Sequence, residues 1–142
     1  MLVFVDTREQ KSIEFPKSFR TALKVGDYTT EALKSNFVIE RKSPQDLYGS
    51  IIQNHLRFRR MLQRAEESGI KVVVFVECLE SEFYKKTWKG GNERLVHGKV
   101  LKKIIGTISR RYEIEFVWCS NRTVMANKMI TRLRKEERNL KQ

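Results

Sequence analysis

The residues Phe37 to Lys42 begin as an apolar strand pattern and then place an acid, an arginine and a lysine in a row. Side chains alternate across a strand, so Glu40 and Lys42 point to one face and Arg41 points to the other. Burying Glu40 beside Lys42 in packed core would be costly. We therefore expect this strand to emerge at an open, wet end of a sheet.

Further carboxylates fall where they could reach the same place. Asp27 follows Gly26 at a turn, and Asp6 ends an apolar run. Three carboxylates suit a hard cation such as Mg²⁺, which takes oxygen ligands together with phosphate oxygens and waters. Such a metal would polarise a phosphate and ready a water for attack, while Lys42 would hold that water or stabilise the charged transition state. The D…ExK spacing is weak by itself, so a surface strand end with an ordinary ion pair stays open as an alternative.

The elements that must position these residues can be read from the apolar pattern. Strands are expected at 2–6, 36–42, 71–77 and 113–118, and the continuous apolar run at 71–77 is typical of a central strand covered on both faces. Helices are expected from the Ser43-Pro44 start and over about 55–67, 96–111 and 123–137. Alternating helices and strands predict a three-layer α/β domain over residues 1–142, with a central mixed sheet flanked by helices.

The charge predicts the class of partner. Lys and Arg number 29 against 17 for Asp and Glu, a net charge of +12 at pH 7, which favours a polyanion such as nucleic acid over a membrane. No apolar run approaches the roughly 20 residues of a membrane span. The N-terminus shows no signal-peptide pattern, so we expect an intracellular protein that is not secreted. Cys78 and Cys119 are expected to be buried thiols at strand ends.

Two basic segments are candidates for DNA binding. Arg57, Arg60 and Arg64 form a stripe on the helix expected over 55–67, which could equally be a solvated helix face. A loop mixes cations with an aromatic ring that could stack an unpaired base, at Lys85, Lys86, Trp88 and Lys89. This loop could also have no role beyond solubility.

Longer motifs carry a more specific signal. The strings VDTRE (5–9), VGDY (25–28) and VIERKSPQDLYGSI (38–51), followed by the arginine-rich helix, occur in this order. The chain closely resembles the XPF/Hef family of structure-specific DNA endonucleases. That resemblance implies a restriction-endonuclease-like fold, dependence on Mg²⁺ or Mn²⁺, and cleavage of one strand near junctions in flap, fork or branched DNA, in repair or recombination.

The resemblance also assigns roles by position. Asp27 and Glu40 look like metal ligands, Lys42 like the catalytic lysine, and Asp6 like an accessory acid at the metal. Arg8 and Glu9 belong to the surroundings of Asp6. Two further motif positions each have two possible roles. Arg41 is either a structural ion-pair partner or a contact of the catalytic site. Asp46 is either site support or a first-turn helix acid.

The same family commonly carries a helix-hairpin-helix domain or a helicase, and neither is present in these residues, so we expect either a compact nuclease or an excised domain. The resemblance implies a homodimer, or a heterodimer with a related subunit, and Met125, Ile130 and Leu133 are candidate contacts if they are not core. Two other functions stay open: a catalytically silent subunit that binds branched DNA, and a nuclease for a specific sequence or for RNA.

Overall fold

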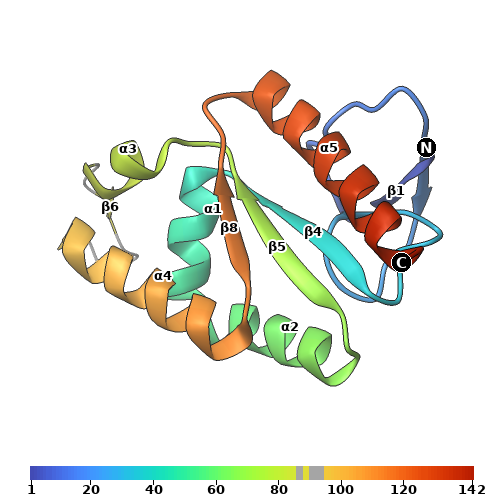
Figure 1. Ribbon diagram of the computed structural model, residues 1–142. Coiled ribbons are helices and arrows are strands. Elements are labelled where there is room, and N and C mark those ends of the chain that lie inside the picture. The colour runs from blue at the N-terminus through green and yellow to red at the C-terminus, as the bar shows by residue number, and fades with distance from the viewer. Residues whose placement is uncertain (86–87, 90–94) are drawn as a thin grey trace.

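The computed structural model describes residues 1–85, 88–89 and 95–142. Within them a mixed six-stranded sheet runs in the order β2-β1-β3-β4-β5-β8 (Figure 1). The strands β4 and β5 lie in parallel at its centre, with β8 parallel at one edge and β2 parallel to β1 at the other. The short strand β3 runs antiparallel to both β1 and β4. The strand bounds are β1 Val3–Asp6, β2 Ser18–Thr21, β3 Tyr28–Thr29, β4 Phe37–Lys42, β5 Lys71–Val76 and β8 Glu115–Trp118.

Helices cover both faces of the sheet, which makes three layers (Figure 1). One face is covered by α1 (Pro44–Tyr48), α2 (His55–Glu67) and α4 (Gly98–Tyr112), and the other by α5 (Arg122–Leu140). A short helix, α3 (Glu80–Lys85), leads to a separate two-stranded sheet of β6 (Trp88–Lys89) and β7 (Leu95–Val96). Among the described helices, none is long and apolar enough to cross a membrane.

The alternation of β4 divides its side chains between the two layers. Val38 packs with α2, while Phe37 and Ile39 pack with α5. Strand β5 is apolar from Val72 to Val76 and is buried on both sides, because its neighbours and both helical layers enclose it. The expected central strand and the three-layer mixed sheet are therefore confirmed.

Local signals set the start of the helices that follow β4. Ser43 is extended and its hydroxyl accepts a hydrogen bond from the backbone N–H of Asp46, while Pro44 occupies the first turn. The sequence did not predict the π-helical segment η1 (Gly49–Gln53), which connects α1 to α2. Helix α2 then spans the residues expected for it, with Phe58, Leu62 and Ala65 buried.

The structure places two of the three candidate dimer contacts of α5 in the core. Met125 and Leu133 are fully buried against the sheet, in the same cluster as Phe37 and Phe75. These two side chains fill the domain's own core, so they are not available as contacts between subunits. Ile130 is only partly buried, and dimer formation itself stays a prediction. Cys78 and Cys119 carry buried thiols, as expected.

Candidate active site

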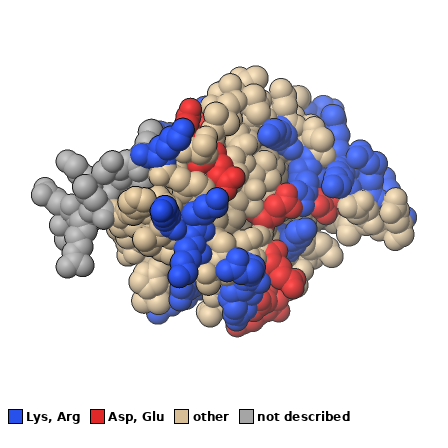
Figure 2. Space-filling model, turned by 60° about the vertical axis from the view of Figure 1, so that its left-hand side comes forward, with Lys and Arg blue, Asp and Glu red and all other residues tan. Residues whose placement is uncertain are grey.

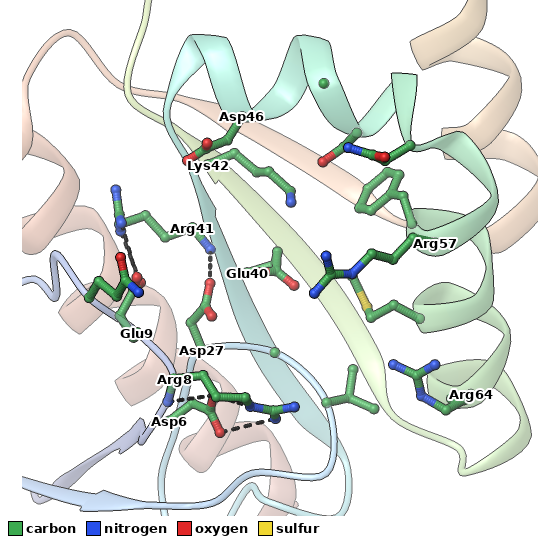
Figure 3. A pocket seen from close by; sticks show the side chains of 18 of the residues that line it. Asp6, Arg8, Glu9, Asp27, Glu40, Arg41, Lys42, Asp46, Arg57 and Arg64 are labelled. Atoms are coloured by element: carbon green, nitrogen blue, oxygen red, sulfur yellow. Dashed lines mark hydrogen bonds and ion pairs between the residues drawn. The ribbon is translucent and has the colours of Figure 1, made fainter. Parts of the chain in front are cut away.

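A cleft of about 790 Å³ opens between the N-terminal strands and the α1–α2 layer (Figure 3). Its walls come from the ends of β1 and β4, the turn before β3, and the helices α1 and α2. Most of the sequence-predicted site residues line it, namely Asp6, Arg8, Glu9, Asp27, Glu40, Arg41, Lys42, Asp46, Arg57 and Arg64. The fold therefore brings these residues together around one cleft.

The carboxyl groups of Asp27 and Glu40 meet in the cleft. Gly26 precedes Asp27 with a φ of +79°, a left-handed conformation that favours glycine, and its Cα lies against the Val38 side chain. The backbone then fixes Asp27 on both sides, because its N–H donates to Ile39 O over 2.9 Å and its carbonyl accepts from Asp6 N over 2.8 Å. Burial and the adjacent Glu40 carboxylate raise the pKa of Asp27 to about 9. Asp27 therefore keeps its proton at neutral pH, and a cation bound beside it would favour the ionised form.

Lys42 shares a face of β4 with Glu40, as the strand alternation predicted (Figure 3). Its ammonium lies 5.3 Å from the centre of the Phe58 ring, a cation–π contact from α2. Within the described part of the chain, Lys42 forms no ion pair, so its charge is available to a ligand in the cleft.

Arg41 turns to the opposite face and forms a buried ion pair with Glu9. Its Nε and Nη2 donate to the two carboxylate oxygens over 2.9 and 3.0 Å. The Tyr28 hydroxyl also donates to Glu9 over 3.0 Å, and it accepts from Ile13 N over 2.9 Å. Burial opposes ionisation of Glu9, but the hydrogen bond from Arg41 lowers its pKa overall. The side chain of Arg41 is therefore a structural ion-pair partner. Its backbone N–H contributes to the site by donating a hydrogen bond to Asp27.

Asp6 lies at the end of β1 with both carboxylate oxygens occupied. Arg8 binds both of them, at 2.8 Å from Nε and 3.2 Å from Nη2, and Leu23 N donates to Oδ1 over 2.8 Å. Burial works against ionisation of Asp6, but these hydrogen bonds lower its pKa. The role of Asp6 as a metal ligand stays a prediction, and it requires Arg8 to release an oxygen.

Asp46 lies both at a helix start and at the wall of the cleft, and its part in the site stays a prediction. It lies in the first turn of α1, where its N–H binds Ser43 Oγ over 3.0 Å and its negative charge faces the helix N-terminus. Its exposed side chain also lines the cleft (Figure 3).

The structure separates the predicted DNA-binding residues. Arg57 and Arg64 project from α2 into the cleft, and Arg57 points toward Glu40 (Figure 3). Arg60 is exposed on the same helix but does not line the cleft. Lys85 is exposed at the end of α3, Lys86 lies outside the described residues, and the side chains of Trp88 and Lys89 are likewise not described. Lysine and arginine gather in several groups on the face in Figure 2, with acidic side chains between them.

The sequence reasoning missed several polar residues of the cleft wall. Lys24 lies directly before Val25-Gly26-Asp27, and that closeness to the motif was the available signal. The same signal marks Gln10, which directly follows the string at 5–9, and Gln45, which lies within the string at 38–51. No motif includes Gln53 and Asn54, which reach the cleft only through the fold.

The residues present can be tested against the expected Mg²⁺. Within the described residues, no three His, Cys, Asp or Glu side chains group closely enough to hold a metal ion. Mg²⁺ is, however, commonly bound by one or two carboxylates together with substrate phosphates and waters. Asp27 and Glu40 supply two carboxyl groups on the wall of the cleft, and this donor set fits the ion.

Comparison with solved structures identifies the class of fold. XPF from Aeropyrum pernix superposes with a TM-score of 0.73 at 20% identity, over 99% of this chain and 67% of that chain. A second structure, XPF from Aeropyrum pernix in complex with DNA, gives a TM-score of 0.69 at 19% identity, over 97% and 66%. The domain has the restriction-endonuclease-like α/β fold, and it spans about two thirds of the length of these solved chains.

The family follows from the sequence match. The model of the ERCC4 domain matches residues 5–131, and the chain therefore belongs to the ERCC4 family of nuclease domains. A search of curated protein sequences returned no match.

Proposed function

We propose that the protein is a Mg²⁺-dependent, structure-specific DNA endonuclease that cuts one strand of flap, fork or branched DNA near the junction. The observation that carries this proposal is the meeting of Asp27 and Glu40 beside Lys42 in an open cleft with arginines on its wall. Membership of a nuclease family supports it, as does the fold shared with a protein solved in complex with DNA.

Each side chain has a part in the proposed hydrolysis. Asp27 and Glu40 would hold the metal. The backbone N–H of Arg41 orients the Asp27 carboxyl group through a hydrogen bond of 2.7 Å to Oδ2. Bound there, Mg²⁺ would polarise the scissile phosphate and lower the pKa of a water. Lys42 would donate to a phosphate oxygen and stabilise the negative charge of the transition state. Arg57 and Arg64 would neutralise the phosphates on either side of the scissile phosphate.

The proposal is tested by incubating labelled flap, fork and plain duplex DNA with Mg²⁺, with Mn²⁺ and with a chelator. We expect cleavage only with metal and mainly of the branched substrates. Asp27→Asn, Glu40→Gln and Lys42→Met should each reduce kcat at least 100-fold, in line with the loss of transition-state stabilisation. Unchanged cutting by folded variants would reject the assignment.

Asp46→Asn is the matched control among the cleft carboxylates, because its backbone keeps the bond to Ser43 and its side chain lies at the cleft wall. It should reduce cleavage less than Asp27→Asn. The same substrate panel decides the remaining alternatives. Tight binding of branched DNA without cleavage under any metal identifies a silent subunit, and preferential cutting of an RNA hairpin identifies an RNA nuclease.

A further inference from the structure

The outer side of α5 carries a basic surface that no role proposed for the cleft explains. Lys128, Arg134, Lys135 and Arg138 are all exposed there, and we call them the α5 basic face. At 3.6 residues per turn they fall within an arc of about 120°, and they extend over about 15 Å of the helix axis. The buried Met125, Met129 and Leu133 hold the opposite side of α5 against the sheet, so this face points outward.

Acidic groups compensate little of this surface: Glu115 interacts electrostatically with Lys135, but its carboxylate binds Arg132. The two glutamates of α5 are only partly exposed, and both are engaged elsewhere. Glu136 binds Arg132 over 2.9 Å, and Glu137 accepts from the Thr30 hydroxyl over 2.7 Å. Across the described residues, none of the four cations of the α5 basic face forms an ion pair. Other exposed residues on this arc, Asn127 and Thr131, are uncharged hydrogen-bonding groups.

The face lies apart from the cleft but is firmly connected to it. Glu40 and Lys42 belong to the α2 side of the sheet, and α5 covers the other side (Figure 1). Arg122, in the first turn of α5, donates to the carbonyls of Lys11 and Ser12 over 2.9 Å each. These carbonyls follow Gln10 of the cleft wall, so a ligand on α5 would be held in a fixed relation to the cleft.

We propose that the α5 basic face binds the phosphate backbone of a DNA arm other than the one held in the cleft. Phosphates complement a row of lysines and arginines that form no ion pairs among the described residues, and branched DNA offers a second arm by its nature. The proposal rests on the proposed function for the identity of the partner, but it concerns binding and not cleavage. Self-association through this face is disfavoured, because a two-fold contact would bring like charges together.

The test compares two variants with the same loss of charge. Lys128, Lys135 and Arg138 are changed to Gln in one, and Lys99, Lys102 and Lys103 of the exposed α4 surface are changed to Gln in the other. Binding of forked DNA, and of a short single strand, is measured by fluorescence anisotropy in chelator at several salt concentrations. We expect the α5 variant alone to bind the fork about tenfold more weakly, with a slope of log K against log salt smaller by up to about 2.7. Its affinity for the short strand should stay near that of the unmodified protein.

Equal losses in both variants would show general charge attraction, and an unchanged α5 variant would show no contact; either result overturns the proposal. An independent check uses Lys135→Cys, whose thiol can be labelled selectively with a photo-crosslinker because Cys78 and Cys119 are buried. Crosslinking to one arm of the fork supports the contact, and its absence opposes it. If the unmodified protein cuts no DNA while only the α5 variant loses fork affinity, the proposed function fails and this inference stands.

Discussion

The backbone amide of Arg41 donates to Oδ2 of Asp27 over 2.7 Å, although the two residues lie 14 positions apart in the chain. Asp27 is thus held by the residue next to Glu40, while the guanidinium of Arg41 is anchored by Glu9 on the other side of β4. One residue therefore joins the carboxylate pair of the cleft to a buried ion pair behind it.

Asp27→Asn should stabilise the metal-free protein while it reduces cleavage. The raised pKa of Asp27 means that the folded state binds a proton more tightly than the unfolded chain. Its contribution to stability is complete below the ordinary Asp pKa and is lost as pH rises toward 9. We expect the variant to unfold with a free energy at least about 1 kcal/mol higher near pH 8 in chelator, the equivalent of about one pKa unit.

The measurement is urea unfolding of both proteins between pH 5 and pH 9. The difference in stability should grow with pH. It should shrink when Mg²⁺ is added, because only the unmodified protein keeps both carboxyl groups to bind the metal and is stabilised by it. A difference that does not change with pH would contradict the assignment of the proton to Asp27.

The Glu9–Arg41 pair should behave as a buried ion pair, since the two side chains are only 9% and 8% exposed. Glu9→Gln leaves the guanidinium without its counter-charge, and a loss of about 3–5 kcal/mol in unfolding free energy is expected. Changing Arg41 to Met in the same protein should recover part of that loss. A double-mutant cycle by urea unfolding measures the coupling, and simple additivity of the two changes would count against it.

Tyr28→Phe should weaken the same network more mildly. It removes the hydrogen bond to Glu9 and leaves the buried N–H of Ile13 without its acceptor. The expected cost is about 1–3 kcal/mol of stability. If Tyr28 also helps to position Asp27 through Glu9 and Arg41, kcat should fall while KM for the fork stays near its original value. A change in stability alone would limit Tyr28 to a structural role.

The arginines of α2 should differ in their effect on DNA. Arg57→Gln and Arg64→Gln remove cations that line the cleft, and each should weaken binding and lower the salt slope by about 0.9. Arg60→Gln removes the same charge from the same helix outside the cleft, and it should have a much smaller effect. Titrations by anisotropy at several salt concentrations separate them. Equal losses from all three would place the DNA along the whole exposed face of α2.

Gly26→Ala should disturb the site more than Gly69→Ala. Both glycines are left-handed, with φ of +79° and +70°, and alanine there costs about 1–2 kcal/mol. At Gly26 the added methyl group would also strike the Val38 side chain, whereas nothing lies within 4 Å of it at Gly69. We expect a further loss of about 1–3 kcal/mol and reduced cleavage for Gly26→Ala only. Thermal unfolding and the fork assay measure both.

Local sequence signals predicted much of the fold. Ser43-Pro44 marked a helix start that the structure confirms, and the apolar run at β5 marked the central strand. The segment η1 was not predicted, since a π-helical turn depends on packing between α1 and α2 and has no distinct residue pattern.

The site was predicted as a set of residues but not as a set of contacts. Strand alternation placed Glu40 and Lys42 together, because it depends only on neighbours in sequence. The occupation of both Asp6 oxygens depends partly on Leu23, 17 positions away, which no local pattern encodes. The same holds for Arg60, whose separation from the cleft follows from how α2 rests on the sheet.

The strand β3 is only two residues long, and Tyr28 is paired with Ile39 in a narrow ladder. A slip of one residue in this pairing would send Asp27 to the opposite face without removing a helix or a long strand. Misassembled molecules could therefore match native ones in circular dichroism and yet be inert. Specific activity of purified material should be normalised by titration of competent sites rather than by protein mass.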